Sequence, residues 1–399
     1  MMNVVSYSKA SELFAEKFSA LLKTETLPVD QAIGRVLSCD VFCEEELPAY
    51  RRSTVDGYAL NAKDVMVCSQ SAPSVLKIVG SVKMGQMPER KVSRGECMYI
   101  PTGGALPDGA DCVAMIEQAE VLGDELFLSA PLSNMQNAVE RGEDFKKGDM
   151  TASKGTYLSP NAASAIAGTG TKNVCVYTKL KYFIISTGDE LVAYDEKLPL
   201  GKIRDLNTIL LSDASPLWEC SGKARVGDDY ELLKKTALEA AEICDVVLLS
   251  GGSSVGRQDY TERLLNELGE IFLRGVALKP GKPTVAASSE GKLFIGLPGH
   301  PAAAFTVLKT LCLKAYEKSL GMKEKVKVKA KADINFAGGK GRTLIMPVRL
   351  YSIDGELYFS PVFGKSGMSG SIASADGFAV VADNIEGINK GEILDIELI

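Results

Sequence analysis

The sequence has few side chains of the kinds that hold zinc. Its 399 residues contain one histidine, and none of its nine cysteines belongs to a C-x-x-C pair. These two absences argue against a zinc site with the usual cysteine and histidine ligands. Any bound metal is therefore expected to be a hard cation held by oxygen atoms. Because the cysteines are odd in number and scattered, we interpret them as reduced thiols in a cytoplasmic protein.

Long apolar runs are also absent. No run approaches the roughly 18 residues that a membrane-spanning helix needs, so no membrane association is predicted. Charged residues interrupt the apolar positions near the start of the chain, at Lys9, Glu12, Glu16 and Lys17. The N-terminal segment therefore lacks the uninterrupted apolar core of a signal peptide.

The chain has no excess of positive charge. It carries 45 lysines and arginines against 51 aspartates and glutamates, which gives a formal net charge of −6. Without surplus cations to neutralise phosphates, broad binding to nucleic acid is not predicted. A small anionic ligand needs only a few local cations, so a site for one stays open.

The composition that remains is that of an ordinary globular protein, with 46% apolar and 24% charged residues. A chain of this length has room for two to four domains, each with its own core. Changes of pattern along the sequence predict four. They are residues 1–45 with 141–178 as an elongated supporting domain, 46–140 as an inserted β-rich domain, 179–321 as an α/β domain, and 322–399 as a C-terminal β-barrel domain.

The first 140 residues predict two helices followed by short strands. Apolar spacing predicts a first helix capped by Ser8, and a second short helix at 29–37. The stretch 47–58 is interpreted as a long polar loop. Strands separated by glycine and proline turns are predicted at 75–84, 96–101, 112–120 and 125–129.

From Lys181 the pattern alternates between strand and helix, which predicts a doubly wound, mostly parallel sheet. Strands are expected at 181–186, 223–226, 245–250, 283–287 and 293–297. Helices are expected near 207–220, at 230–243, at 259–268 and after Pro301. Beyond Gly321 the pattern becomes β again, with a hairpin turn at Asp354-Gly355, which predicts a small C-terminal barrel.

Two loops at predicted strand ends carry candidate ligand-binding groups. The run from Gly251 to Gly256 suggests a phosphate cradle closed by a helix N-terminus, although it is not a Walker A loop. Asp259, in the following helix, is either a metal ligand or an ordinary acidic residue of the first helical turn. The carboxylates of Asp189 and Glu190 follow a strand directly, where Mg²⁺ binding and helix capping are about equally favoured.

Two further loops contain basic or titratable side chains. Lys279 and Lys282 lie in a Lys-Pro-Gly-Lys-Pro segment, where the prolines restrict the backbone and favour an oxyanion site over two solvated lysines. His300, between a glycine and a proline, is interpreted as a hydrogen-bonding loop residue because no nucleophile or orienting partner is evident. No serine has the context of a nucleophile elbow, which argues against covalent acyl chemistry.

Taken together, eight ordered motifs resemble the MoeA family of molybdopterin molybdenumtransferases, which includes the E domain of gephyrin. The resemblance covers nearly the whole chain. The motifs are Ser53 to Ala59, Thr102-Gly103-Gly104, Arg141 to Asp144, Ser186 to Leu191, Gly251 to Tyr260, Lys279 to Pro283, Gly296 to Pro301, and Ser366-Gly367-Met368.

The resemblance implies a four-domain subunit that forms an elongated homodimer. It also implies that molybdate and adenylylated molybdopterin are the substrates, that molybdenum cofactor and AMP are the products, and that Mg²⁺ assists. The implied catalytic residues are Asp56, Asp144, Glu190, Lys279 and Lys282. The implied substrate-binding residues are Thr102, Thr187, Gly188, Asp228, Gly251, Gly252, Ser253, Ser254, Gly256, Pro298, Gly299, Pro301, Arg342 and Ser371. The implied metal ligands are Glu190 and Asp259.

The sequence departs from the usual family pattern at three places. His300 stands where asparagine is common, Ala303 where serine is frequent, and Arg51-Arg52 where an Asp-Asn pair is usual. Two alternatives stay open, a non-catalytic gephyrin-like scaffold and a molybdopterin adenylyltransferase-type enzyme. Retained acidic residues and lysines favour an enzyme over a scaffold, and the flanking domains disfavour the adenylyltransferase. Expected protein partners are that adenylyltransferase and apo-molybdoenzymes.

Overall fold

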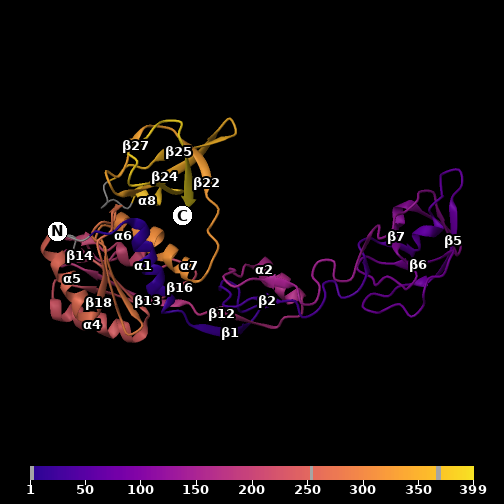
Figure 1. The fold of residues 1–399 in the computed structure, drawn as a ribbon, viewed down its shortest axis with the longest axis horizontal. Coiled ribbons are helices and arrows are strands. Elements are labelled where there is room, and N and C mark those ends of the chain that lie inside the picture. The colour runs from indigo at the N-terminus through magenta and orange to yellow at the C-terminus, as the bar shows by residue number, and fades with distance from the viewer. Residues whose placement is uncertain (1–3, 252–254, 365–369) are drawn as a thin grey trace.

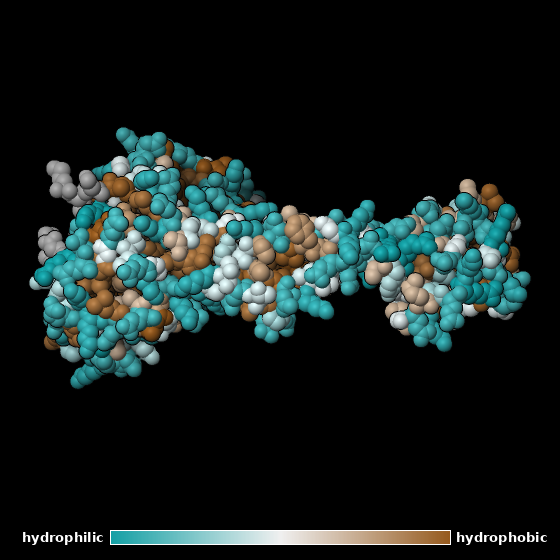
Figure 2. Space-filling view, turned by 60° about the horizontal axis from the view of Figure 1, so that its bottom comes forward, coloured by the Kyte–Doolittle hydropathy of each residue, from teal (hydrophilic) through white to brown (hydrophobic). Residues whose placement is uncertain are grey.

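The molecule is elongated, with a central sheet near one end and a β-rich part at the other (Figure 1). The computed structural model describes residues 4–251, 255–364 and 370–399, with the backbone alone for 255–259. A narrow, mostly hydrophilic neck leads to the distal part, as Figure 2 shows. Among the described helices, none combines the length and the apolarity that crossing a membrane requires.

Six strands form the central sheet, in the order β16, β13, β17, β21, β20, β18. Neighbours among the first four run parallel, whereas the last two strands pair antiparallel. This confirms the predicted mostly parallel sheet, whose apolar strands are covered on both faces. The strands are β13 (Leu180–Thr187), β16 (Trp218–Val226), β17 (Val246–Ser250), β18 (Glu270–Arg274), β20 (Val285–Ser289) and β21 (Lys292–Leu297).

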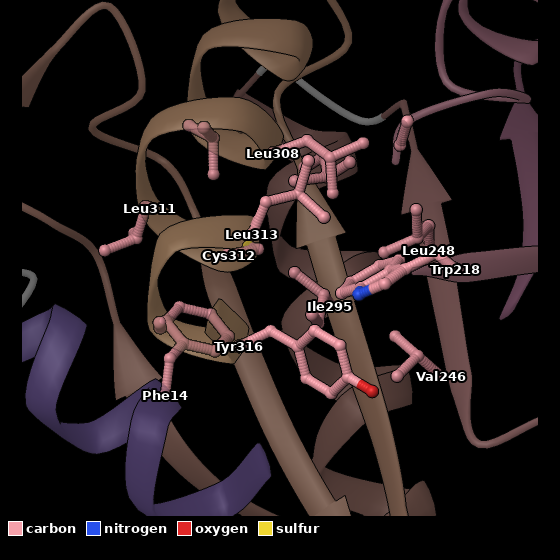
Figure 3. Packing of buried hydrophobic residues seen from close by; sticks show 14 of the residues in the cluster. Phe14, Trp218, Val246, Leu248, Ile295, Leu308, Leu311, Cys312, Leu313 and Tyr316 are labelled. Carbon is pink, nitrogen blue, oxygen red and sulfur yellow. The ribbon is translucent and has the colours of Figure 1, made fainter. Parts of the chain in front are cut away.

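Helices cover the two faces of the sheet. On one face α4 (Tyr230–Ile243) and α5 (Val255–Leu268) share an apolar cluster with the strands. The other face carries a continuous helical segment and, beside it, the N-terminal helix (Figure 3). Its elements are α1 (Tyr7–Ser19), α6 (Pro301–Val307), the π-helical η3 (Leu308–Leu313) and α7 (Lys314–Ser319).

Aromatic side chains join α1 to this second face. The ring of Phe18 lies 5.7 Å from that of Trp218 and 5.5 Å from that of Tyr316, and all three are buried. The division of the chain into four domains stays a prediction. The structure adds that α1, which a boundary at residue 45 groups with the supporting part, shares its core with the central sheet.

Four local predictions near the strands and helices are wrong in detail. Ser6, not Ser8, caps α1, because Ser6 has extended backbone and its side chain accepts from the N–H of Lys9. Residues 29–34 form turns instead of a helix, with Gly34 at φ +84°. The stretch 47–58 is less irregular than predicted, since it contains β3 (Arg52–Ser53) and the start of β4.

The fourth error concerns the helix expected near 207–220. The structure has only α3 (Asn207–Leu210), and β16 begins at Trp218. Pro216 disfavours helical backbone at the residue before it. The indole of Trp218 is then buried among aromatic rings from β13 and α7, and this packing outweighs local helix preference.

The distal part is a six-stranded sheet in the order β7, β4, β6, β5, β9, β8. Its strands confirm the predicted β-rich segment, and buried residues such as Leu60, Leu76 and Leu126 form its core. The strands are β4 (Gly57–Leu60), β5 (Ser74–Ser81), β6 (Glu96–Ile100), β7 (Cys112–Met115), β8 (Ala119–Leu122) and β9 (Glu125–Leu128).

Two-stranded ribbons and one helix connect the two ends of the molecule (Figure 1). A separate apolar cluster, which includes Leu37, Leu158 and Ile166, stabilises this connection. The elements are β1 (Thr24–Pro28) paired with β12 (Asn173–Tyr177), β2 (Val41–Phe42) paired with β11 (Met150–Ala152), and α2 (Pro160–Gly168).

The C-terminal part confirms the predicted barrel. Five strands pair in a closed ring, because β24 contacts both β25 and β26 while β22 and β28 complete the circle. The predicted hairpin turn at Asp354-Gly355 joins β24 to β25. The strands are β22 (Val328–Ala332), β24 (Thr343–Ile353), β25 (Glu356–Pro361), β26 (Gly377–Val381) and β28 (Ile393–Leu398).

Candidate active site

Loops that follow parallel strands meet at one edge of the central sheet. Ser186 of β13 pairs with Ser250 of β17, which in turn pairs with Leu297 of β21. The residues that come next on these strands are Thr187, Gly251 and Pro298. Such an edge is where open α/β sheets bind ligands. The structure thus brings together three of the predicted substrate-binding loops.

Gly251 lies against Thr187 more closely than any other residue type allows. A Cβ atom at Gly251 would be 2.0 Å from the Oγ1 of Thr187, and the φ angle of Gly251 is +151°. Glycine is therefore required by both space and backbone conformation. The contact fixes the start of the proposed phosphate cradle directly beside the end of β13.

Three acidic residues, Asp189, Glu190 and Asp228, belong to the loops that follow β13 and β16. The N–H of Asp228 donates to Oδ1 of Asp189 over 3.0 Å, so Asp189 links two loops and has a structural role. The Glu190 carboxylate instead folds over Gly188, where a Cβ atom would be 2.7 Å from its Oε2. Glu190 and Asp228 are the other two acidic residues of these loops.

This donor set fits Mg²⁺ better than a metal that needs a full protein cage. Among the residues that the structure describes, no group of three or more histidine, cysteine, aspartate or glutamate side chains forms a metal cluster. Mg²⁺ is commonly held by one or two carboxylates together with substrate phosphates and water. Glu190 with Asp228 would meet that need.

The lysine loop is fixed by hydrogen bonds to its surroundings. The N–H of Val276 donates to the carbonyl of Lys282 over 3.1 Å, and Oγ1 of the buried Thr284 donates to the carbonyl of Gly281 over 2.7 Å. The side chains of Lys279 and Lys282 are both exposed. Two cationic groups are therefore presented to solvent from a hydrogen-bonded loop.

The C-terminal barrel reaches this loop. The short strand β19 (Leu278–Lys279) pairs in parallel with β24, so that Leu278 lies opposite Thr343. Arg342 directly precedes β24, and Lys279 is opposite Leu344 in the pairing. Both Lys279 and Arg342 are predicted site residues, and their segments lie side by side although they belong to two parts of the chain.

Ser371 lies in a short helix beside a buried contact between the barrel and α6. It belongs to α8 (Gly370–Ala373), whose buried Ile372 shares a core cluster with Phe305 and Phe378. The rings of Phe305 in α6 and Phe378 in β26 lie 6.3 Å apart. Because α6 begins at Pro301, directly after the Pro298-Gly299 loop, the barrel and the strand-end loops share one support.

The remaining described candidates lie elsewhere. Oδ1 of Asp56 accepts a 2.9 Å hydrogen bond from the N–H of Thr102, and both residues lie in the distal part. Asp144 lies near the neck, where its N–H donates to the carbonyl of Leu47 over 3.0 Å. Within one chain these three residues are far from the central sheet (Figure 1).

Several candidates fall outside the described residues. They are Gly252, Ser253, Ser254, the side chain of Asp259 and the Ser366-Gly367-Met368 motif, whereas Gly256 has backbone in α5. The three departures from the family pattern are described. His300 occupies the N-cap of α6, Ala303 is buried, and the guanidinium of Arg51 donates to the carbonyl of Ala110 over 3.3 Å.

A buried polar network beneath the strand-end loops is not predicted by any of the sequence motifs. It contains Ser186, Asp205, Asn207 and Ser250. The available signal was that the apolar runs of β13 and β17 both reach a serine as they end. In the partner segment the sequence pattern predicts only a helix near 207–220, which includes Asn207 but not Asp205.

Comparison with known proteins points to one family. Three family models match, described as MoeA N-terminal region (domain I and II) at residues 5–170, probable molybdopterin binding domain at 183–318, and MoeA C-terminal region (domain IV) at 329–399. Two solved structures of molybdopterin biosynthesis MoeA protein from Pyrococcus horikoshii are similar over nearly their full length. One is 32% identical with a TM-score of 0.79 and covers 99% of both chains; the other is 28% identical with a TM-score of 0.84 and covers 100% of both.

Curated relatives also match this chain over nearly its full length. A protein of Staphylococcus aureus named molybdopterin molybdenumtransferase is 29% identical, across 94% of this chain and 90% of its own length. A protein of the same name from Haemophilus influenzae is 28% identical, across 99% of this chain and 98% of its own length.

Proposed function

The chain belongs to the MoeA family, and we infer from this that it is a molybdopterin molybdenumtransferase, a transferase that inserts molybdenum into molybdopterin. We propose that molybdate supplies the metal and that the second substrate is adenylylated molybdopterin. Molybdenum cofactor and AMP are then the products. The observation that supports this most is the pairing of β19 with β24, which sets the segment of Lys279 beside the segment that follows Arg342.

The proposed roles follow from charge and position. Lys279, Lys282 and Arg342 attract the molybdate oxyanion, with Ser371 as a further hydrogen-bonding contact. Thr187, Gly188 and the loops that start at Gly251 and Pro298 hold the pterin phosphate and the adenylate. Positioned cations and N–H groups of this kind stabilise charge that develops during reaction, which is commonly the largest catalytic effect.

We propose that Mg²⁺ assists at the carboxylate side of the site. Glu190 and Asp228 would hold it, and Asp259 is proposed as a further ligand from sequence alone. Held by these residues, Mg²⁺ would supply positive charge that offsets the phosphate charge and assists the leaving group. Glu190 and Asp228, which follow β13 and β16, lie at the same edge of the sheet as the proposed phosphate loops.

We propose that the active form is a homodimer. Asp56, Thr102 and Asp144 carry proposed roles, yet one chain keeps them far from Lys279 and Glu190 (Figure 1). A second copy would supply them if its distal part and neck lay against the central sheet of the first. A symmetric dimer would then have two equivalent sites. We further propose that the enzyme acts in the cytoplasm, and that it receives substrate from the adenylyltransferase and delivers product to apo-molybdoenzymes.

The test mixes purified protein with adenylylated molybdopterin, molybdate and Mg²⁺ and measures AMP by chromatography. We expect release of AMP that depends on molybdate. Lys282→Ala should reduce it by about a hundredfold or more, because a positioned charge is lost. Lys329→Ala, at an exposed position of β22, is the matched control and should keep wild-type activity. Folded wild-type protein that releases no AMP would overturn the proposal.

A further inference from the structure

Buried polar side chains form a hydrogen-bonded network that connects the strand-end loops. Its side chains belong to the ends of β13 and β17 and to the segment that opens α3. Between 1% and 7% of each residue is exposed, so water hardly reaches them. Buried polar groups are unfavourable unless they are hydrogen-bonded, and here the bonds run between loops of the candidate site. The members are Ser186, Asp205, Asn207 and Ser250.

Asp205 holds the segment that opens α3 in place. Its Oδ1 accepts from Oγ of Ser186 over 3.0 Å, from the N–H of Asn207 over 3.1 Å, and from the N–H of Thr208 over 3.2 Å. These three hydrogen bonds satisfy the buried carboxylate oxygen. The backbone of Asn207 is therefore fixed relative to the end of β13.

The side chain of Asn207 reaches two different loops. Its Nδ2 donates to Oγ of Ser250 over 2.5 Å and to the carbonyl of Gly299 over 2.9 Å. Ser250 immediately precedes Gly251, and Gly299 lies in the loop after β21. One amide group thus spans the two loops to which we assign substrate binding.

The oxygen atom of the Asn207 side chain shows that the amide has one preferred orientation. Oδ1 of Asn207 is buried and has no hydrogen-bond partner among the described residues. Turning the amide over would place that oxygen against the carbonyl of Gly299, where two acceptors would repel. The carbonyl of Gly299 therefore requires a donor at this position, even though the opposite atom stays unpaired within the described part of the chain.

We propose that Asn207 is a positioning residue that sets the spacing between the Gly251 loop and the Pro298-Gly299 loop, and thereby the affinity for the phosphate-bearing end of the substrate. The second half of this proposal rests on the proposed function. The first half concerns the loops alone and can be tested without any ligand.

The decisive variant is Asn207→Asp, which keeps size and shape but replaces the donating Nδ2 by an oxygen. Ser250 can still donate to that oxygen, whereas the carbonyl of Gly299 cannot, so the substitution selectively breaks the bond to Gly299. We expect KM for adenylylated molybdopterin to rise about tenfold or more, with kcat within about threefold of wild type, because the lysines and carboxylates are untouched. As the pH falls, protonation of the introduced carboxyl restores a donor, and the increase in KM should shrink.

Hydrogen exchange provides the readout that needs no ligand. Peptides that cover residues 296–304 should exchange faster in Asn207→Asp than in wild type. Thr208→Val changes the half-buried neighbour in the same turn and serves as the matched control, with exchange and KM unchanged. If Asn207→Asp does not fold, Ser250→Ala removes the other partner and should give a smaller shift in the same direction.

The possible results test the two parts of the proposal, the loop spacing and the substrate affinity, separately. Unchanged exchange in both Asn207→Asp and Ser250→Ala overturns the positioning role. Faster exchange with an unchanged KM overturns the link to substrate affinity. If wild-type protein releases no AMP, the proposed function fails, and the exchange measurement still decides whether Asn207 sets the loop spacing.

Discussion

Neighbouring acidic residues at the end of β13 have different surroundings. Asp189 accepts a hydrogen bond from the backbone of Asp228 and holds two loops together, whereas the carboxylate of Glu190 lies over Gly188. A residue that supports a loop should affect folding, and one that holds a cation should affect cation dependence. The pair therefore offers a clear separation of structural and catalytic effects.

We predict that Glu190→Gln raises the Mg²⁺ concentration needed for half-maximal AMP release by about tenfold or more, because one anionic ligand is lost. The measurement is a Mg²⁺ titration of turnover. Glu196→Gln is the matched control, since Glu196 forms a 3.1 Å ion pair with Arg225 on the surface. An identical Mg²⁺ dependence in wild type and Glu190→Gln would remove Glu190 from the metal site.

Buried thiols predict how stability depends on pH. Burial raises the pKa of Cys97 and that of Cys112 from 9.0 to about 12. The folded state therefore holds these protons more tightly than the unfolded state. The resulting stability is complete below about pH 9, and it is lost as the pH rises towards 12.

We expect the free energy of unfolding of wild-type protein to fall between pH 9 and pH 11, as measured by urea denaturation. Cys97→Ala should be less stable at pH 7 because it leaves a cavity, but it should lose less stability over this interval. Cys220→Ala, at a half-buried position, is the control and should follow the wild-type pH dependence. Parallel curves for wild type and Cys97→Ala would contradict the assignment to Cys97.

At the scale of elements, the lysine loop depends on its fit against α6. Gly281 has a φ angle of +128°, and a Cβ atom there would lie 2.6 Å from Cγ2 of Val307. The loop is therefore seated on the same helix that follows the Pro298-Gly299 loop. A small displacement of the loop would move Lys279 and Lys282 together.

We predict that Gly281→Ala lowers AMP release by about ten- to a hundredfold, since displacements near 1 Å cost that much when reacting groups must be aligned. Gly291→Ala is a matched control. Gly291 has a φ angle of +76°, and a Cβ atom there would have no heavy atom of the described residues within 4 Å, so the substitution gives backbone strain without a clash. Equal losses of activity in the two variants would show that strain, not contact with α6, is responsible.

Helices and strands with a regular local pattern could be predicted from the sequence, whereas those that depend on distant contacts could not. The helix at 230–243 and the strand at 245–250 have regular apolar spacing, and the structure reproduces them to within one residue. The helix expected near 207–220 failed because Trp218 is buried by residues distant in sequence, which local periodicity does not report. Residues 29–34 failed for a related reason: the segment that follows pairs with Tyr157 and Val176, far along the chain.

In the candidate site, too, some contacts could be predicted from the sequence and others could not. Parallel strand order is enough to predict that Thr187 and Gly251 are neighbours, and the structure shows this. The Asn207 bridge depends on an amide that reaches Gly299 across the sheet edge, 92 residues away in the chain, so no spacing rule reveals it. The roles assigned to the site residues stay predictions, because geometry alone does not test them.

At the scale of the whole molecule, the length of the chain separates two sets of proposed residues. Asp56 and Thr102 are hydrogen-bonded to each other in the distal part, whereas Lys282 and Arg342 belong to segments at the end of the molecule that holds the central sheet (Figure 1). The neck between them is narrow and mostly hydrophilic (Figure 2). A single subunit in this shape cannot present both sets to one substrate, so a shared site needs two subunits.

Mixed dimers test this arrangement. We predict that Asp56→Asn and Lys282→Ala are each nearly inactive alone, and that co-expression of the two restores activity. A mixed dimer would contain one site with both defects and one with neither. With random pairing about half of the dimers are mixed, so the recovered activity is about a quarter of wild type. If each subunit instead builds its own site, every site carries a defect and no activity returns. Co-expression of Lys282→Ala with Lys279→Ala is the control, because both residues lie in one loop and cannot complement in either arrangement.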